Sequence, residues 1–450
     1  MGSQRILLTA GSNAKGQLGI RSYDDAHAFT PCQFAGCEPN QLPISASRAT
    51  HIACGANHTV LLLQRLDGST TLWGTGDGRR GQLGSGYFCG ADSGSEERGP
   101  EPGLGSVPWT TFHELVLGPE PSWADSEYTH KHVAAAWETT YVVLARPGGS
   151  DVLLSMGSDE FGALGGGGGG DGRPQANTAV PQAGSARVVS FDHVFPDDAG
   201  REACRTVCVR SLHAGPRHVV AQLVMTSAAT HSDGSSARPR CQTVLVGWGA
   251  SRHGQLGQNG GVRFVARPTR LPVDVDDDPM VSCALGNQHT VVLHASGRIS
   301  AFGSNKQGQI PSLGSHMRIC GLGCTWNGTY MQTIEGDEQV LRSVGNNAQG
   351  QLGRGCTTDT AVSLPADRAL SGFVCGSEHV LATMSSSSRG SDSVVGWGWN
   401  EHGNMGLGSL GNVSIPTQLW PREDVEVYRK YPQKVVDIWA GCATSWLLVE

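Results

Sequence analysis

The sequence predicts an all-β fold, a seven-bladed β-propeller in which one blade is shared between the N- and C-termini. Two repeated motifs and the two chain ends lead to this prediction. A glycine-rich turn motif occurs at 11–19, 76–84, 157–165, 249–257, 303–310, 345–353 and 398–406. A short apolar segment entered through small residues alternates with it, at 54–63, 135–144, 214–223, 285–294, 323–332, 375–384 and 441–450.

Each repeat is expected to form one antiparallel sheet. Apolar runs of about five residues that end at glycine turns are typical of strands. In the segment 293–303 a Ser-Gly turn separates two such runs, which indicates a hairpin. A sheet of about four strands buries both faces only against neighbouring sheets, so the repeats are expected to stack radially as four-stranded blades.

The chain ends support closure of the ring. The chain ends with TSWLLVE and begins with MGSQRILLTAGSN, and joined tail to head they resemble the internal unit HTVLLLQRLDGSTTLWGTGD. We therefore expect Ile6–Thr9 to pair with Trp446–Val449 in a shared blade, which would remove the last open sheet edges.

The whole chain, 1–450, is predicted to be a single propeller domain. Its 63 glycines are scattered among short apolar runs, as expected for many tight turns. The spacing between turn motifs is uneven, because segments rich in Gly, Ser, Pro and charge lengthen three repeats. These segments, at 85–131, 166–205 and 225–241, are predicted to be loop insertions.

Composition argues against several classes of function. The formal net charge is −7 and no basic arm is present, so direct binding to nucleic acid is not expected. The N-terminal apolar run is too short for a signal peptide, and nothing approaches a membrane span. The 13 cysteines include no CxxC pair, which favours reduced thiols in a cytoplasmic and nuclear protein that needs no metal or other cofactor.

The sequence contains no catalytic constellation, and the chain is predicted not to be an enzyme. The glycine turns lack the following helix that a dinucleotide fingerprint requires, so they are interpreted as structural turns. Four histidines recur at one position of the repeat and are expected to bond neighbouring backbone rather than a metal: His58, His218, His289 and His379.

The tryptophans fall into two groups. Trp73, Trp248 and Trp397 precede the turn glycine, where the repeat needs an aromatic residue for blade packing. Four others lie in or beside turns that are small or polar in most repeats, where large rigid rings can anchor a partner. With the polar residues beside them, they form the predicted partner-binding set: Trp137, Glu138, Trp326, Trp399, Glu401, His402 and Trp446.

The two motifs, G-x-N-x-x-G-Q-L-G and G-x-x-H-[ST], resemble the repeats of the regulator-of-chromosome-condensation family over essentially the whole chain. The departures from the generic repeat are similar to those of the fungal α-tubulin suppressor or killer-toxin-insensitivity propellers. They are VAAAWETTYVV at 133–143, the Trp326 turn, GSEHVLAT at 376–383, GWGWNEHGNMG at 396–406 and GCATSW at 441–446.

This second resemblance implies a function. Such propellers pair with a small CSL-type zinc-finger protein that carries the metal and electron-transfer chemistry. The heterodimer supports diphthamide biosynthesis and Elongator-dependent modification of the wobble uridine of tRNA, so the propeller would meet Elongator and the diphthamide synthase only indirectly.

Two other functions are possible for this repeat family. The first is guanine-nucleotide exchange on a Ran-like small GTPase, although the acidic net charge disfavours the chromatin anchoring associated with it. The second is light sensing by tryptophan, which would require a GWRHT-type motif that the sequence lacks.

Overall fold

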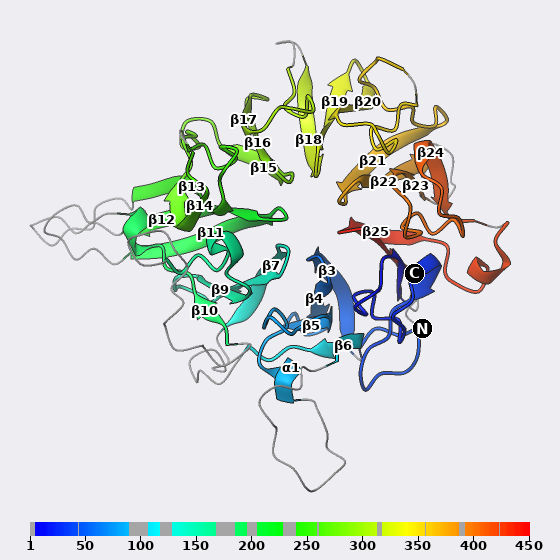
Figure 1. Ribbon diagram of the computed structural model, residues 1–450, viewed down its shortest axis with the longest axis horizontal. Helices are drawn as coiled ribbons and strands as arrows, with labels where there is room; N and C mark the ends of the chain where they lie inside the picture. The colour runs from blue at the N-terminus through cyan, green and yellow to red at the C-terminus, as the bar shows by residue number, and fades with distance from the viewer. Residues whose placement is uncertain are drawn as a thin grey trace, which may run out of the picture.

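A computed structural model describes residues 5–43, 45–89, 107–117, 128–167, 185–195, 205–227, 240–258, 261–312, 317–355, 357–386, 392–422 and 424–450. Seven antiparallel sheets are arranged in a ring, each with its first strand nearest the axis (Figure 1). The predicted seven-bladed β-propeller is therefore confirmed.

Blades 1 to 3 each contain four strands in chain order. Blade 1 consists of β3 (Ala46–Cys54), β4 (His58–Arg65), β5 (Thr70–Gly76) and β6 (Trp109–Glu114). Blade 2 consists of β7 (Thr129–Ala135), β8 (Thr139–Ala145), β9 (Val152–Gly157) and β10 (Arg187–Val188). Blade 3 consists of β11 (Arg205–Ala214), β12 (His218–Ser227), β13 (Arg240–Ala250) and β14 (Phe264–Arg270).

Blades 4 to 6 follow the same order. Blade 4 consists of β15 (Met280–Leu285), β16 (His289–His294) and β17 (Ile299–Gly303). Blade 5 consists of β18 (Arg318–Thr325), β19 (Gly328–Glu335) and β20 (Glu338–Gly345). Blade 6 consists of β21 (Arg368–Cys375), β22 (His379–Ser386), β23 (Ser393–Gly398) and β24 (Val413–Trp420).

Blade 7 closes the ring with strands from both chain ends. β25 (Val435–Ala440) and β26 (Thr444–Val449) come from the C-terminal end, and β1 (Ile6–Gly11) and β2 (Ala26–Pro31) from the N-terminal end. β1 pairs with β26 in the predicted register, from Ile6 opposite Val449 to Thr9 opposite Trp446. All residues of both strands are buried, so the closure is also part of the core.

The expectation of four strands in every blade was wrong within the described residues. Blades 4 and 5 have three strands each. In blade 5 the segment after β20 contacts the sheet through a single bridge, between Arg342 and Ala361, and forms no ladder. Proline in these segments, at 311 and 365, removes a backbone donor that an outer strand could use.

The predicted insertions are only partly loop in the described structure. The range 85–131 includes the outer strand β6 and the start of β7, and the range 166–205 includes β10. β12 and β13 extend into both ends of the range 225–241. The segments 90–106, 118–127, 168–184, 196–204 and 228–239 lie outside the described residues.

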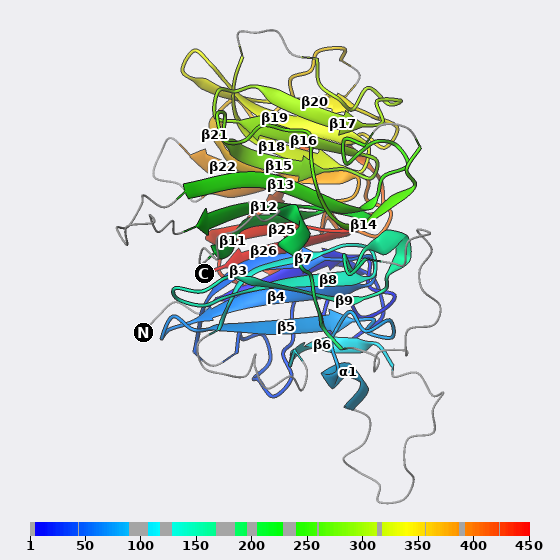
Figure 2. The same ribbon diagram turned by 90° about the vertical axis from the view of Figure 1, so that its left-hand side faces the viewer.

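Helices are short and peripheral in the described part of the chain. The helix α1 (Gly86–Cys89) directly follows the second turn motif and lies beside β6 (Figure 2), although no helix was expected there. The other helical segments of the described chain are three 3-10 turns, η1 (Glu160–Gly162), η2 (Asp192–Val194) and η3 (Glu426–Tyr428). Among the described residues, no helix is long and apolar enough to cross a membrane.

The core lies between neighbouring blades, where the predicted packing tryptophans are found. Trp248 and Trp397 are fully buried and Trp73 is nearly so. The indole N–H of Trp248 donates to the Ala163 carbonyl of the preceding blade (2.9 Å), and that of Trp397 donates to Gln351 (2.9 Å). These bonds satisfy the only polar group of each ring, so the indoles join successive blades without an unpaired donor.

A β-bulge interrupts each of the seven innermost strands at the equivalent position. The pairing skips Thr50, Lys131, Arg210, Val281, Cys320, Ser371 and Val436. A bulge bends a strand and increases its twist. Each bulge lies four residues before the end of its strand at the axis, or five in β18, so it influences the direction of that end.

Candidate functional site: the turn face and the mouth of the channel

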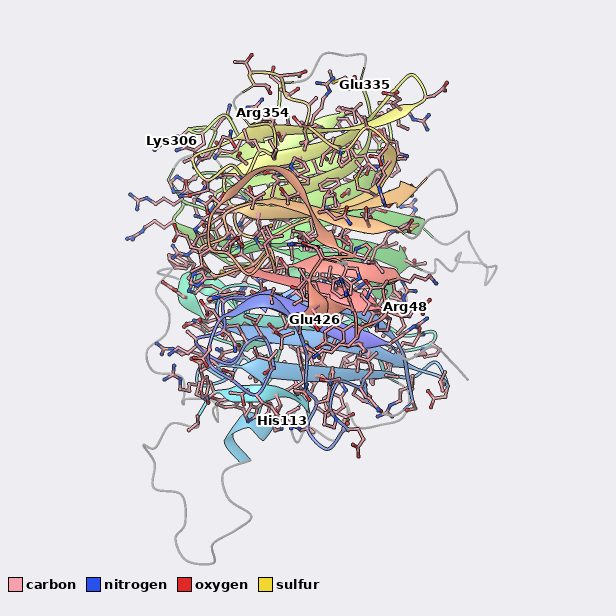
Figure 3. All side chains as sticks on the ribbon, turned by 90° about the vertical axis from the view of Figure 1, so that its right-hand side faces the viewer. Arg48, His113, Lys306, Glu335, Arg354 and Glu426 are labelled. Carbon is pink, nitrogen blue, oxygen red and sulfur yellow. The ribbon has the colours of Figure 1, made fainter. Side chains whose placement is uncertain are left out.

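Both repeated motifs lie on one face of the propeller, which we call the turn face. In every blade, the glycine-rich turn donates a backbone hydrogen bond of 2.7–2.9 Å to the turn that enters the second strand. The pairs are Ser12–Ala443, Asp77–Asn57, Ser158–Glu138, Ala250–Arg217, Ser304–Gln288, Asn346–Asn327 and Trp399–Glu378. Lys306 of one turn motif and Arg48 at the start of β3 project from opposite faces (Figure 3).

Glycine is needed where the two turns meet. Gly76 has a φ of +97°, and a Cβ built on it would lie 2.4 Å from the Asn57 carbonyl oxygen. Both the backbone conformation and the close approach therefore exclude a side chain. The glycine turns are structural, as expected.

The repeat histidines join blades through side chains, which corrects the expectation that they bond neighbouring backbone. The Nε2 atom of each histidine lies 2.8–3.1 Å from a hydroxyl on the second strand of the next blade. The pairs are His58–Thr140, His218–Thr290, His289–Thr329 and His379–Ser445. Blades 2, 5 and 7 have no histidine at this position; blades 2 and 5 instead have a tryptophan in the turn.

The second residues of the seven entering turns surround the axis. Ala56, Trp137, Asn287, Trp326 and Ser377 each donate a backbone N–H to the turn of the next blade, at 2.7–2.9 Å. Pro216, which has no N–H, stands at the equivalent position of blade 3 and interrupts this ring. The ring forms the mouth of a central channel.

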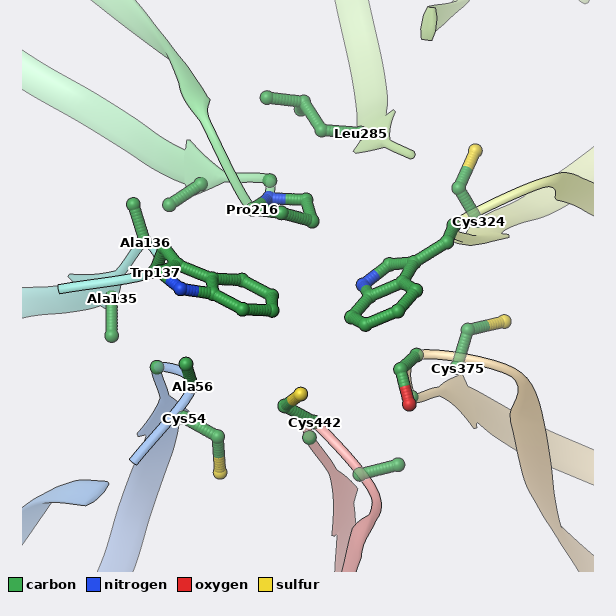
Figure 4. A pocket seen from close by; sticks show the side chains of 18 residues that line it. Cys54, Ala56, Ala135, Ala136, Trp137, Pro216, Leu285, Cys324, Cys375 and Cys442 are labelled. Atoms are coloured by element: carbon green, nitrogen blue, oxygen red, sulfur yellow. The ribbon is translucent and has the colours of Figure 1, made fainter. Parts of the chain in front are cut away.

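Trp137 and Trp326 project over this mouth. Their ring centroids lie 5.9 Å apart with an interplanar angle of 44°, although they belong to blades 2 and 5. Figure 4 shows Trp137 pointing to the centre of the pocket, with Ala56, Pro216 and Cys442 around it. Both indoles are half-buried, so they remain accessible from the turn face.

A cation already contacts Trp137. The guanidinium of Arg217 lies 5.9 Å from the centroid of this indole and 5.2 Å from that of Phe161. Glu138, beside Trp137, is half-buried and forms a loose ion pair with Arg80 at 3.8 Å. Charged side chains of both signs therefore surround the mouth.

Thiols line the channel below the indoles. Cys54 and Cys375 end the innermost strands β3 and β21, Cys324 is the penultimate residue of β18, and Cys442 lies in the turn of blade 7 (Figure 4). Burial raises the pKa of Cys54 to about 11 and the pKa of Cys324 and Cys442 to about 12. The neutral thiol that results is a weak nucleophile and a weak metal ligand. Within the described ranges, no group of three or more His, Cys, Asp or Glu residues could hold a metal ion.

Trp399 and His402 lie farther from the axis on the same face. Their rings meet edge to face at 5.2 Å, and His402 Nδ1 lies 2.7 Å from Asp25 Oδ2 of blade 7. Both rings are half-buried, and Glu401 between them is exposed. Six of the seven predicted contact residues are thus accessible on the turn face: Trp137, Glu138, Trp326, Trp399, Glu401 and His402.

The prediction that Trp446 contacts a partner is wrong, because this residue is buried. Its side chain is fully buried, with the indole N–H directed to Thr444 Oγ1 at 3.3 Å and the ring edge-on to Phe112 at 6.1 Å. It lies in the middle of β26, where side chains alternate between two covered faces. The sequence places it near a turn, but it belongs to the core.

Glu378 is a residue of this face that was not predicted from the sequence. Its carboxylate accepts hydrogen bonds from Asn327 Nδ2 (2.8 Å) and Gln351 Nε2 (2.9 Å), and burial raises its pKa. The sequence does mark this position, because Glu378 is the third residue of an entering turn, and the third residue of each entering turn lies beside the mouth. These residues differ from blade to blade, and only Glu138 among them was selected.

Three channel histidines were also missed. His51, His132 and His213 come from the innermost strands of blades 1, 2 and 3. Burial, and then repulsion from the other two, lowers the pKa of His213 to about 4. His51 and His132 occupy the same position, directly after the bulge of their strand, whereas His213 lies one residue before the end of β11, so the three do not form one repeated motif.

Comparisons with known proteins agree with this architecture. The model of the regulator of chromosome condensation (RCC1) repeat matches residues 6–62, 245–293 and 391–448, and a second RCC1 repeat model matches 281–309. The secretion-regulating guanine nucleotide exchange factor of Mus musculus is 26% identical over 92% of this chain and 78% of its own length. An RCC1 repeat-containing protein of Schizosaccharomyces pombe is 23% identical over 99% of both chains.

A third relative is matched over less of its length. The ultraviolet-B receptor UVR8 of Arabidopsis thaliana is 29% identical over 46% of this chain, which corresponds to 47% of the receptor.

Two solved structures share the fold over the whole chain. Human WBSCR16 has a TM-score of 0.65 and 16% identity, with 99% of that chain covered. Prp20p from Saccharomyces cerevisiae, a protein with binding properties to Gsp1p and histones, has a TM-score of 0.65 and 14% identity, with 92% of that chain covered. The chain is thus a seven-bladed propeller with a shared closing blade, and RCC1 repeat models match three stretches of it, 6–62, 245–309 and 391–448.

Proposed function

We propose that this chain is a non-catalytic propeller that binds another protein through its turn face. The observation that carries the proposal is the pair of half-buried indoles, Trp137 and Trp326, at the mouth of the channel. Large aromatic rings that are partly exposed at the centre of a surface are typical anchors of protein interfaces. Trp399 and His402 extend the same surface outward.

The chemistry of the channel favours binding over catalysis. The thiols that line it have raised pKa values, and the channel histidines His51 and His213 have lowered ones, so burial holds both kinds of group neutral. A nucleophile or a general base near neutral pH requires the opposite arrangement, an activated thiol or a histidine that titrates near 7.

The more specific proposal names the partner: the chain would form a one-to-one complex with a small CSL-type zinc-finger protein. The complex would support diphthamide biosynthesis and Elongator-dependent tRNA modification in the cytoplasm and nucleus. The support is the resemblance of the turns around Trp137, Trp326, Trp399 and Glu378 to the tubulin-suppressor propellers. The zinc-finger protein would carry the metal, and the propeller itself would need none.

Co-expression of the tagged chain with a CSL zinc-finger protein tests this form. We expect co-purification at a one-to-one mass by light scattering, lost in the Trp137→Ala/Trp326→Ala variant. Separate elution of two folded proteins would contradict the partner. Elemental analysis that finds stoichiometric zinc or iron in the isolated propeller would contradict the assignment of the metal.

The alternative function is guanine-nucleotide exchange on a small GTPase. It is supported by a relative of that name that matches 92% of the chain. Release of labelled GDP from a Ran-like GTPase separates the two functions. Under our proposal, release in the presence of the propeller matches the spontaneous rate, and a large acceleration would favour the exchange factor.

A further inference from the structure

Glu378 occupies a distinctive place between two accessible tryptophans. The Trp326 N–H donates to the carbonyl of Ser377 (2.7 Å), and the Trp399 N–H donates to the carbonyl of Glu378 (2.9 Å). The backbone of Glu378 is thus bracketed by the two tryptophan-bearing turns of blades 5 and 6. Its half-buried carboxylate faces the same side of the propeller as both indoles.

The carboxylate is held in place but not neutralised by a cation. Asn327 and Gln351 each donate one amide hydrogen bond to it, and both donors are uncharged. Within the described residues, no Lys or Arg contributes to its electrostatic environment, and burial alone opposes its ionisation. The carboxylate oxygens retain lone pairs for a further donor.

Two other acidic groups of the turn face differ in this respect. Glu138 is paired with Arg80 at 3.8 Å, and Asp25 is paired with His402 at 2.7 Å. At the mouth, the guanidinium of Arg217 already lies over Trp137. Glu378 is thus a half-buried carboxylate of this face for which no ion pair with a Lys or Arg is found among the described residues.

We propose that Glu378, which lies between the turns that carry Trp326 and Trp399, forms a subsite for an arginine or lysine side chain of the protein partner. The proposal rests on the proposed binding function and specifies the chemistry of its partner. The partner's cation would form a charge-assisted hydrogen bond with the carboxylate, and its apolar stem would lie along the indoles. Such a contact would relieve the cost of a buried, unneutralised carboxylate.

The conservative variant Glu378→Gln removes the charge while retaining the shape. The carbonyl of the introduced amide can accept from Gln351, and its N–H can donate to Asn327 after the Asn327 amide turns over. Glu338→Gln is the matched control, because it removes one exposed charge from the β19–β20 hairpin at the opposite end of blade 5. Both variants should melt within a few degrees of the wild type.

The test is a selection of peptides from a random displayed library on the full chain, followed by affinity measurement with the synthesised peptides. We expect the selected peptides to share an arginine or lysine. Affinity should fall about 10- to 100-fold with Glu378→Gln, and equally when the arginine is replaced by citrulline or the lysine by glutamine. The two losses should not add in a double-mutant cycle, and Glu338→Gln should have no effect.

Each other outcome has a definite meaning. Peptides that need Trp326 but bind Glu378→Gln as tightly as the wild type would overturn the subsite and leave the binding function standing. Selected peptides without a basic residue would do the same. A library that yields no peptide sensitive to Trp137, Trp326 or Trp399 would contradict the binding surface itself.

Discussion

The indoles of Trp137 and Trp326 meet across the propeller axis with their centroids 5.9 Å apart, although 188 residues separate them in the chain. Each stands in a blade that lacks the repeat histidine, so the two departures from the repeat come together in space. Neither ring is needed to join adjacent blades, because histidine–hydroxyl pairs and the indoles of Trp248 and Trp397 form the hydrogen bonds between blades.

Replacement of Trp137 or Trp326 by alanine should weaken the partner complex much more than it weakens the fold. Loss of a central aromatic anchor typically costs about 2–4 kcal/mol, or about 30- to 1000-fold in affinity. Because the rings touch, the double variant should lose less than the sum of the single losses. Calorimetric titration of the co-purified partner measures the affinity and thermal unfolding the stability. A large fall in melting temperature with unchanged affinity per folded molecule would assign the indoles to the core.

Trp446→Ala should behave in the opposite way. The side chain is fully buried against Phe112 in the closing blade, so its removal leaves a cavity and should destabilise the fold by about 3–5 kcal/mol. Urea unfolding followed by tryptophan fluorescence gives this value, and partner affinity at low temperature should be unchanged. A stable variant with lost affinity would show that Trp446 reaches the surface in solution.

Deletion of residues 441–450 should abolish cooperative unfolding. It removes β26, which lies between β1 and β25 and provides a row of buried side chains to the core. Both remaining strands would then present open edges that promote aggregation. Glu450→Gln is the control, because it weakens only the terminal ion pairs with Arg5 (2.8 Å) and Lys434 (2.5 Å) and should cost about 1 kcal/mol. A truncated chain that is soluble and melts like the control would disprove closure by this strand.

The fold could be predicted because its determinants are local and repeated. Each glycine turn marks a blade end, and the terminal half-units of the chain, Ile6–Thr9 and Trp446–Val449, complement one another. The loss of a fourth strand in blades 4 and 5 depends on segments without a repeated pattern, so the repeat count could not reveal it. The bulges at Thr50 and its equivalents follow from strand curvature near the axis, for which the sequence contains no separate signal.

The site was predictable only where a residue departs from a repeated position. Trp137 and Trp326 stand out in this way, and they are the residues that meet at the mouth. Trp446 departs from the repeat equally, but it lies inside the strand β26, only two residues beyond the turn. In a strand, a shift of one residue moves a side chain to the opposite face of the sheet, so the sequence alone could not decide its position. Glu378 was missed because its importance comes from Asn327 and Gln351, which only the fold brings to it.

The buried histidines predict a pH-dependent stability. Burial lowers the pKa of His58, His289 and His379 to about 4 and that of His218 to about 3, against 6.5 for a free side chain. The unfolded chain therefore binds more protons than the folded one between pH 6.5 and about 4. The free energy of unfolding should be fully retained above pH 6.5 and should fall as the pH decreases through this window.

A single substitution separates this effect from the titration of carboxylates. His379→Gln retains an amide that can donate to or accept from Ser445 Oγ but cannot be protonated, so the variant should lose stability less steeply than the wild type between pH 7 and 5. A shift of about two pKa units corresponds to roughly 3 kcal/mol per histidine over the full window. Urea unfolding at half-unit pH intervals measures the slope, with His27→Gln, at an exposed position, as the control. Parallel curves for His379→Gln and the wild type would show that this histidine is not buried as a neutral ring, whereas a reduced slope would confirm that it joins blades 6 and 7 in that form.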